Sequence, residues 1–243
     1  MREHVRKWVV VGGTALVAAC GGSEAKPAAT PSVPVESTTA GGARPVSAVP
    51  AAGARVLIVG TSLTAGLGLD PDSAYPAVLQ RLADSSGYKA TVVAAGLSGE
   101  TSAGALRRVE WLPREPADVV VIESGANDGL RGLRPDSTKA NLVGIIRKVR
   151  TAHPDARVLL AQMEAPPNLG PGFTRGFREL FLEISRDEGV TLIPFFLDGV
   201  AGKRELNQDD GIHPNEAGAR IAARNMWKVL GPVLRQVPAA LGR

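Results

Sequence analysis

Apolar residues recur along the chain in short continuous runs, and each run ends at a glycine, a proline or a polar residue. The runs cover residues 56–59, 90–95, 119–122, 158–161 and 190–193. Because these runs are continuous rather than alternating, they predict strands that are covered on both faces of a sheet.

Amphipathic stretches of helix length lie between and after these runs. They cover residues 74–85, 102–112, 137–152, 175–188 and 216–237. Residues that favour helix starts or ends flank them: Asp136, Ser137, Asn215 and Glu216 at starts, and Gly87, Pro154 and Gly189 at ends. A strand followed by a helix, repeated five times, predicts a five-stranded parallel sheet with right-handed crossovers and helices on both faces. We therefore expect a three-layer α/β/α domain over residues 54–237.

The first twenty residues have the character of an export signal. Three basic residues precede the uncharged residues 8–19, which are too few to cross a bilayer as a helix. Residues 17–20, Val-Ala-Ala-Cys, resemble the bacterial lipobox, so Cys20 is the expected lipid attachment site. We therefore expect an exported, membrane-anchored lipoprotein that faces the periplasm or the cell exterior. Two alternatives are ordinary signal-peptidase cleavage near Ala18-Ala19 and a buried N-terminal strand with an incidental cysteine.

Residues 21–53 are rich in Gly, Ser, Ala, Pro and Thr and carry four charged residues. They lack the periodic apolar positions of a helix or a strand. This composition predicts a disordered linker between the membrane and the domain. The last few residues of the stretch could instead form an irregular arm packed on the domain.

Composition narrows the class of protein further. The 243 residues, 44% hydrophobic and 21% charged, describe a globular protein of one domain or at most two small ones. Cys20 is the single cysteine, so no internal disulfide can form. Half of the formal net charge of +4 belongs to residues 1–20, and no basic cluster is interleaved with aromatic residues. We therefore expect no nucleic-acid partner.

Small and polar residues follow three of the predicted strands and precede the last helix. The segments are 60–66 (GTSLTAG), 96–102 (GLSGETS), 123–129 (ESGANDG) and 209–214 (DDGIHP). In an open parallel sheet the ligand site lies beyond the carboxyl ends of the strands, so we expect these segments to meet. Together they offer a hydroxyl, an imidazole, a carboxylate and amide donors, which is the set that acyl transfer to serine requires.

Each candidate residue also has an ordinary alternative. Ser62 could be a helix N-cap, His213 a surface residue and Asp210 a turn residue. Asn127 could be a left-handed turn residue and Gly99 a turn glycine. The three-residue spacing of the aspartate and the histidine does allow the carboxylate to reach the imidazole Nδ1 and to fix its tautomer.

Taken together, the four segments resemble the sequence blocks of the SGNH hydrolases, also called GDSL esterases. The resemblance runs from Val56 to Leu230 and is most similar to the bacterial arylesterases and multifunctional acyl-thioesterases and lysophospholipases. The G-x-S-x-G elbow of the α/β-hydrolase fold is absent, because Leu-Thr-Ala-Gly follows Ser62. The resemblance implies a flavodoxin-like SGNH hydrolase fold and the hydrolysis of carboxylic esters or thioesters.

The resemblance also implies a role for each candidate. Ser62 would be the nucleophile, His213 the general base and Asp210 the group that orients the base. The oxyanion hole would consist of the backbone N–H groups of Ser62 and Gly99 and the side-chain amide of Asn127.

Two residues depart from the family pattern. The family usually has Asp directly before the nucleophile, whereas this chain has Thr61, which accepts fewer hydrogen bonds than a carboxylate. We expect activity to survive, with Asp128 as a supporting carboxylate. Ser124 stands where the related branch would have glycine.

Two loops are placed to wall the site, at residues 129–133 and 163–173. Their apolar side chains suggest a wall for a short to medium acyl chain: Leu130, Leu133, Met163, Leu169 and Phe173. The same residues could equally be packing residues of plain surface loops.

We therefore expect a monomeric serine esterase that needs no cofactor. No metal ion is expected, because no second His or Cys is available to complete a transition-metal set. Carbohydrate O-deacetylation is possible on the same fold. A non-catalytic surface lipoprotein with a degenerate hydrolase site is a further alternative, motivated by Thr61 and the tether, but the presence of Ser62, Asp210 and His213 argues against it. A nucleotide-binding or phospho-receiver module lacks its glycine-rich phosphate fingerprint here.

Overall fold

The structure is a computed structural model that describes residues 53–112 and 115–237. The export signal, Cys20 and the predicted linker up to residue 52 lie outside these residues, so they stay predictions. Within the described part of the chain, no helix combines the length and the apolar character that crossing a membrane requires.

Five parallel strands form one sheet in the order β2-β1-β3-β4-β5. The strands are β1 (Ala54–Gly60), β2 (Ala90–Gly96), β3 (Val119–Ile122), β4 (Arg157–Ala161) and β5 (Thr191–Ile193). All five predicted strands are confirmed, with ends shifted by at most two residues. The continuous apolar runs predicted them correctly because the central strands are covered on both faces.

The sheet register brings the polar segments together. Gly60 at the end of β1 pairs with Gly96 at the end of β2, and Val59 pairs with Ile122 of β3. The three segments that follow these strands therefore leave the sheet at one edge, as a site beyond the carboxyl ends of parallel strands requires.

Five long helices connect or follow the strands. They are α2 (Tyr75–Ser85), α3 (Ser102–Arg108), α5 (Pro135–Ala152), α6 (Pro171–Glu188) and α7 (Glu216–Arg235). Short helical turns that periodicity did not predict lie among the loops: α1 (Ser62–Ala65), η1 (Pro71–Ser73), η2 (Val109–Trp111), α4 (Ala126–Leu130), η3 (Pro167–Leu169) and η4 (Arg204–Leu206). These turns are too short for a periodic pattern of apolar residues to develop.

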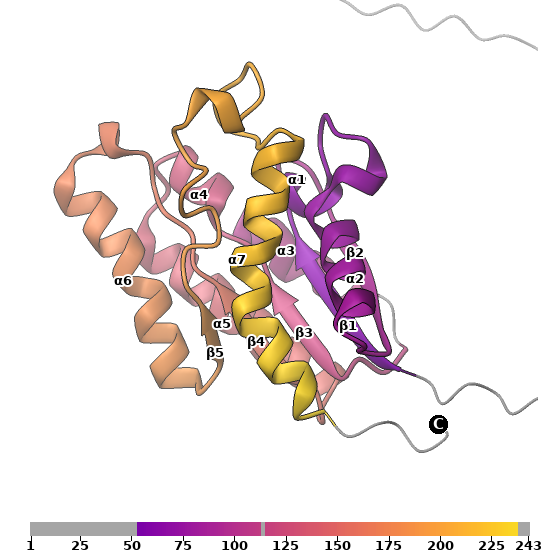
Figure 1. Cartoon of the computed structure of the whole chain (residues 1–243). Helices are drawn as coiled ribbons and strands as arrows, with labels where there is room; N and C mark the ends of the chain where they lie inside the picture. Colours follow the sequence, from indigo (N-terminus) through magenta and orange to yellow (C-terminus); the bar gives the residue numbers. More distant parts are fainter. Residues whose placement is uncertain (1–52, 113–114, 238–243) are drawn as a thin grey trace, which may run out of the picture. The chain divides into compact units, whose positions relative to one another are not determined.

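The helices form two layers around the sheet. In Figure 1, α2 and α7 lie in front of the strands, and α3 and α5 lie behind them. Helix α2 packs on α7, and α5 packs on both α3 and α6. This division follows from right-handed crossovers, because the step from β1 to β2 runs in the opposite direction to the later steps. The fold is thus the expected three-layer α/β/α sandwich.

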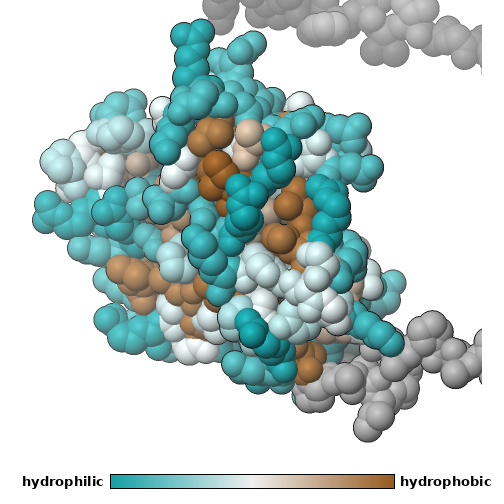
Figure 2. Space-filling view, viewed as in Figure 1, coloured by the Kyte–Doolittle hydropathy of each residue, from teal (hydrophilic) through white to brown (hydrophobic). Residues whose placement is uncertain are grey.

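The core fills both sides of the sheet. Every side chain of β3 is fully buried, and α6 contributes Phe177 and Phe181, whose rings meet edge to face with centroids 5.7 Å apart. Each such side chain adds roughly 1.5–3 kcal/mol by leaving water. On the face that carries α2 and α7, the surface is largely hydrophilic and apolar residues gather in separate patches (Figure 2).

One predicted helix start is confirmed and one is wrong. The side chain of Asn215 accepts hydrogen bonds from the N–H groups of Ala217 and Gly218, so it caps α7. Helix α5 begins earlier than predicted, at Pro135, and Asp136 and Ser137 lie inside its first turn. Proline fits the first helical position, because its φ is already helical and an N–H there would have no partner in the helix.

Candidate active site

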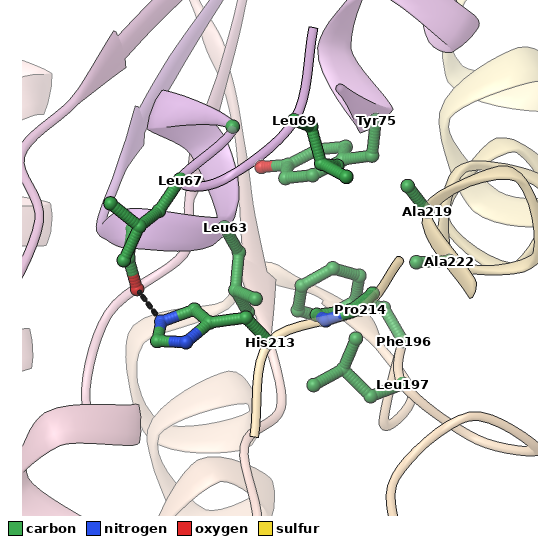
Figure 3. Close-up of a pocket in the computed structure, with 12 residues that line it drawn as sticks. Leu63, Leu67, Leu69, Tyr75, Phe196, Leu197, His213, Pro214, Ala219 and Ala222 are labelled. Carbon is green, nitrogen blue, oxygen red and sulfur yellow. Dashed lines mark hydrogen bonds between the residues drawn. The ribbon is translucent and has the colours of Figure 1, made fainter. Parts of the chain in front are cut away.

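The structure brings Ser62, His213 and Asp210 into one line of hydrogen bonds. The imidazole Nε2 of His213 lies 2.9 Å from the Oγ of Ser62, and Nδ1 lies 2.6 Å from the Oδ2 of Asp210. The dashed line in Figure 3 marks the hydrogen bond between His213 and Ser62. This is the order of groups in which a carboxylate orients an imidazole and the imidazole takes a proton from a serine.

Ser62 owes its place to the turn after β1. It is the first residue of α1, and Thr61 occupies the N-cap position without a side-chain capping bond, so the N-cap alternative for Ser62 is wrong. The helix ends after one turn at Gly66, whose φ of 70° lies in the left-handed region. The side chain of Ser62 is nearly buried, with 7% of its surface exposed.

Asp210 is fixed by its own loop. Its Oδ1 accepts hydrogen bonds from the backbone N–H groups of Ile212 and His213, both at 2.9 Å, which leaves Oδ2 for the imidazole. Burial disfavours the charged carboxylate, but the hydrogen bonds from the His213 side chain and from these two N–H groups outweigh it. They lower the pKa of Asp210 to about 2. Asp210 is therefore ionised and accepts the Nδ1 hydrogen of the imidazole.

Gln208 joins the serine turn to the histidine loop, a role that the sequence did not predict. Its side-chain Nε2 donates to the carbonyl oxygen of Leu67 at 2.8 Å and to that of Pro214 at 3.0 Å. A Cβ on Gly68 would lie 2.1 Å from the Gln208 Oε1, so the close approach requires glycine. Two segments from opposite ends of the domain sequence are thereby held side by side.

Two of the three expected oxyanion donors, Gly99 and Asn127, come from the turns after β2 and β3. Asn127 lies in the first turn of α4, and its Nδ2 donates to the carbonyl oxygen of Glu100 at 3.0 Å. This bond uses one of the two amide hydrogens and leaves the other for a ligand. Gly99 adopts a φ of 75°, and its carbonyl oxygen accepts a hydrogen bond from Arg131 at 2.9 Å.

An ion pair supports this turn from the side of the sheet. Arg108 contacts both carboxylate oxygens of Glu100, the shortest contact being 2.7 Å, and its Nη2 also donates to the carbonyl oxygens of Gly60 and Ala95 at 3.2 Å. Arg108 therefore ties the ends of β1 and β2 to the residue whose carbonyl holds Asn127. Sequence reasoning missed this pair, because Arg108 lies outside the four polar segments and nothing in the segment 96–102 marks Glu100 as its partner.

Asp128 supports the site, although it does not contact the serine turn. Its carboxylate is buried and accepts hydrogen bonds from the N–H of Ser102 at 2.8 Å and the hydroxyl of Ser102 at 2.5 Å. Thr138 donates to the same carboxylate at 3.3 Å. Asp128 thus joins α4 to the starts of α3 and α5.

A second buried carboxylate contacts the residues on both sides of Ser62. Glu123, the residue after β3, accepts hydrogen bonds from the N–H and the hydroxyl of Thr61, both at 2.9 Å, and from the hydroxyl of Thr64 at 2.8 Å. Burial raises the pKa of Glu123, although these hydrogen bonds oppose the shift. Thr61, which replaces the family aspartate, is therefore a hydrogen-bond donor to a neighbouring carboxylate.

The hydroxyl of Ser124 is also buried. No hydrogen-bond partner for its Oγ lies among the residues that the structure describes. Since glycine would leave no such unpaired group, the structure gives no reason for serine at this position.

An apolar pocket adjoins Ser62 and His213. Its walls come from α1, the following loop, α2, the loop after β5 and α7: Leu63, Gly66, Leu67, Leu69, Tyr75, Phe196, Leu197, Pro214, Ala219 and Ala222. Figure 3 shows Tyr75 extending across the pocket with its hydroxyl toward α1. The cavity volume is about 10 Å³, room for about one water molecule. The sequence did not predict these wall residues, because they come from segments that lie far apart in the chain.

Only some of the residues predicted to form the acyl-binding wall are exposed to solvent. Leu130, Leu133 and Leu169 expose 42%, 39% and 36% of their surface and lie on α4, the loop after it and η3. Met163 exposes only 1% of its surface and belongs to the buried core cluster. Phe173 packs with its ring stacked on Phe177, with centroids 6.0 Å apart.

Among the residues that the structure describes, no group of three or more His, Cys, Asp or Glu side chains gathers in a way that could hold a metal ion.

Comparison with known proteins shows the family to which the chain belongs. The profile of the GDSL-like Lipase/Acylhydrolase family matches residues 58–221. The chain is 41% identical over 185 residues to esterase TesA of Pseudomonas aeruginosa, covering 76% of this chain and 91% of that protein. It is 37% identical over 185 residues to thioesterase 1/protease 1/lysophospholipase L1 of Escherichia coli, covering 76% and 86%.

Among solved structures, the crystal structure of TesA superimposes with a TM-score of 0.70 at 40% identity, covering 74% of this chain and 99% of that one. The family to which the sequence blocks pointed is thus confirmed. The chain belongs to the GDSL-like Lipase/Acylhydrolase family and is an SGNH hydrolase.

Proposed function

We propose that this protein is a serine esterase that hydrolyses carboxylic esters or thioesters of short to medium acyl chains. The observation that carries the proposal is the continuous line of hydrogen bonds from Asp210 through His213 to Ser62. In this arrangement the hydroxyl has a base within reach and the base has a partner that fixes its tautomer.

The reaction proceeds in two steps. Nε2 of His213 takes the proton of Ser62 as Oγ attacks the acyl carbonyl, and the ionised Asp210 stabilises the imidazolium. The N–H groups of Ser62 and Gly99 and the free amide hydrogen of Asn127 stabilise the tetrahedral oxyanion. Collapse of this intermediate breaks the bond to the leaving group, which receives the proton from His213. Water, deprotonated by His213, then attacks the acyl-enzyme and releases the acid.

Two features bear on how an acyl chain could bind. The apolar pocket beside Ser62 has room for about one water molecule, so an acyl chain enters it only if its walls move, and a short chain needs the smaller movement. The leucines at positions 130, 133 and 169 are exposed near the proposed oxyanion donors and offer an apolar surface outside the pocket. The names of the relatives, an esterase and a thioesterase/lysophospholipase, agree with variation in the leaving group.

The test is a chain-length series on the full protein. p-Nitrophenyl esters, acyl thioesters, lysophospholipids and an acetylated sugar are assayed with the wild type and with Ser62→Ala. We expect the shorter p-nitrophenyl esters to be hydrolysed and Ser62→Ala to lose at least about 10³-fold in kcat. Ser185→Ala, on the far end of α6, is a matched control that should keep full activity.

Two outcomes would contradict the proposal. Equal hydrolysis by the wild type and Ser62→Ala would remove Ser62 from the mechanism, and activity confined to the acetylated sugar would make the enzyme a carbohydrate deacetylase. A fluorophosphonate that labels the wild type and not Ser62→Ala would show the nucleophile directly. No labelling of the wild type would favour a non-catalytic protein.

We further propose export and lipid attachment at Cys20, based on the lipobox resemblance of residues 17–20. Stable anchoring needs more than one acyl chain, which a lipidated and N-acylated cysteine supplies. Metabolic labelling with a fatty-acid analogue tests this, and a Cys20→Ala variant that still carries the label would overturn it.

A further inference from the structure

We propose that Glu123 is a positioning residue for the nucleophile: its buried carboxylate holds Thr61 and Thr64, which bracket Ser62 in the turn after β1. The inference rests on the proposed function, because it assumes that Ser62 is the attacking group. It adds a residue that does not touch the reacting atoms but determines where they lie.

The geometry of the contacts carries this inference. Oε2 of Glu123 accepts from the N–H of Thr61 at 2.9 Å and from the hydroxyl of Thr64 at 2.8 Å, and Oε1 accepts from the hydroxyl of Thr61 at 2.9 Å. The carboxylate thus binds the residue before the nucleophile twice and the residue two positions after it once. Three bonds to one rigid acceptor fix the backbone on both sides of Ser62.

The residues at the base of the turn are buried and tightly packed. Glu123, Thr61 and Thr64 expose 0%, 1% and 2% of their surface. A Cβ on Gly60 would lie 1.9 Å from the Oγ1 of Thr64 and 2.6 Å from the Oε2 of Glu123, so the carboxylate and the turn pack directly on the backbone of β1. No side chain larger than hydrogen fits at position 60.

Tyr75 extends the network away from the sheet. Its hydroxyl lies 2.6 Å from the Oγ1 of Thr64. The hydrogen of the Thr64 hydroxyl is used on Glu123, so Tyr75 donates to Thr64 and the chain of donors runs from Tyr75 through Thr64 to Glu123. Burial raises the pKa of Tyr75, which keeps this hydroxyl protonated as a donor. The apolar pocket and the nucleophile turn are thereby joined.

The network also shows what the Thr61 hydroxyl contributes in this chain. An aspartate there would bring a second carboxylate against Oε1 of Glu123, and two carboxylates at hydrogen-bond distance must share a proton. The threonine hydroxyl donates instead, so the pair needs no shared proton. Thr61 and Glu123 are complementary in this chain.

The hydrogen-bond inventory separates two substitutions at position 123. In Glu123→Gln the amide oxygen can accept from the N–H of Thr61 and the hydroxyl of Thr64, while the amide nitrogen donates to the Thr61 hydroxyl after that hydroxyl rotates. Glu123→Leu has a similar size but no acceptor, so all three donors lose their partner. If Glu123 positions Ser62, the leucine variant should therefore have a lower kcat and the glutamine variant should not.

The experiment measures kcat, KM, the rate of fluorophosphonate labelling and the Tm of the full protein. We expect kcat and the labelling rate to fall about 10²-fold in Glu123→Leu, because misplacement of a reacting group by about 1 Å has that effect. KM should change little, and Glu123→Gln should stay within about threefold of the wild type. Thr61→Val, which keeps the carboxylate, should fall about tenfold, and Thr61→Ser should restore activity.

Ser185→Ala is the control for stability, because it removes a hydrogen bond at the opposite end of the sheet. If this variant has a lower Tm but an unchanged kcat, a loss of stability alone does not explain a lower kcat in the Glu123 variants. A Glu123→Leu variant with the kcat of the wild type would overturn the inference. If the leucine variant does not fold, a Thr61→Val variant with the kcat of the wild type would overturn it. A defect in Glu123→Gln as large as in Glu123→Leu would also overturn it, since charge rather than position would then matter. If Ser62→Ala retains activity, the proposed function fails instead.

Discussion

The Oγ of Ser62 lies 2.9 Å from the Nε2 of His213, although 151 residues separate them in the chain. The two meet because β1 ends and α7 begins at the same edge of the sheet. Gln208 locks the relationship by donating to carbonyl oxygens on both segments. The arrangement that the proposed mechanism uses therefore follows from the fold.

Asp210→Asn should lower kcat by about 10²- to 10⁴-fold. The amide oxygen can keep the two backbone hydrogen bonds, but the amide nitrogen would then face Nδ1 of His213. The imidazole would accept there and carry its hydrogen on Nε2, where it cannot take the proton of Ser62. Steady-state kinetics with a p-nitrophenyl ester measure the loss. Asp209→Asn, an exposed neighbour, is the control, and equal activity of the two variants would refute the role of Asp210.

Asn127→Ala should lower kcat by about 10²- to 10³-fold with little change in KM, because one oxyanion donor is removed. The side chain is oriented in advance by its bond to the carbonyl of Glu100, so the loss should appear in the chemical step. Chain-length kinetics with the variant measure both constants. A rise in KM at constant kcat would instead show that Asn127 binds the ground state.

Arg108→Met should destabilise the fold by about 2 kcal/mol, because it leaves the buried carboxylate of Glu100 without its partner. Since the carbonyl of Glu100 orients Asn127, kcat should fall as well. Urea unfolding measures the first effect. Arg107→Met, an exposed neighbour, should stay within about 0.5 kcal/mol of the wild type. A stable Arg108→Met with full activity would show that the pair does not support the site.

Glu123→Gln should gain stability relative to the wild type as the pH rises. Burial raises the pKa of Glu123 in the folded protein above its ordinary value of 4.5, so the folded state binds a proton that the unfolded state has released. Between the two pKa values the wild type therefore loses stability with rising pH, and the glutamine variant does not. Urea unfolding from pH 4 to 8 measures the difference, with the exposed Glu179→Gln as control. A difference that does not vary with pH would contradict the prediction.

Much of the fold could be predicted from local sequence. Continuous apolar runs gave the five strands, and amphipathic stretches gave the five long helices, because burial on both faces or on one face leaves a periodic trace. The candidate residues were found for a related reason. Ser62, Gly99, Asn127 and His213 stand in short segments directly after strands or before a helix, where a parallel sheet places its site.

The supporting residues could not be predicted in the same way. Glu123, Arg108 and Gln208 act through partners that lie from 6 to 141 residues away, so no local pattern in the sequence marks their roles. The burial of Met163 could not be predicted either, since an apolar residue near a loop has the same appearance whether its side chain points outward or into the core.

The sequence by itself therefore determined the order of strands and helices, the family and the candidate site residues, because each depends on local pattern. Only the tertiary structure decided how those residues are held. The sheet register, the burial of Glu123 beneath Thr61 and Thr64, and the narrow pocket beside Ser62 all depend on which distant side chains come into contact. Contacts of that kind are properties of packing, and packing exists only once the chain has folded.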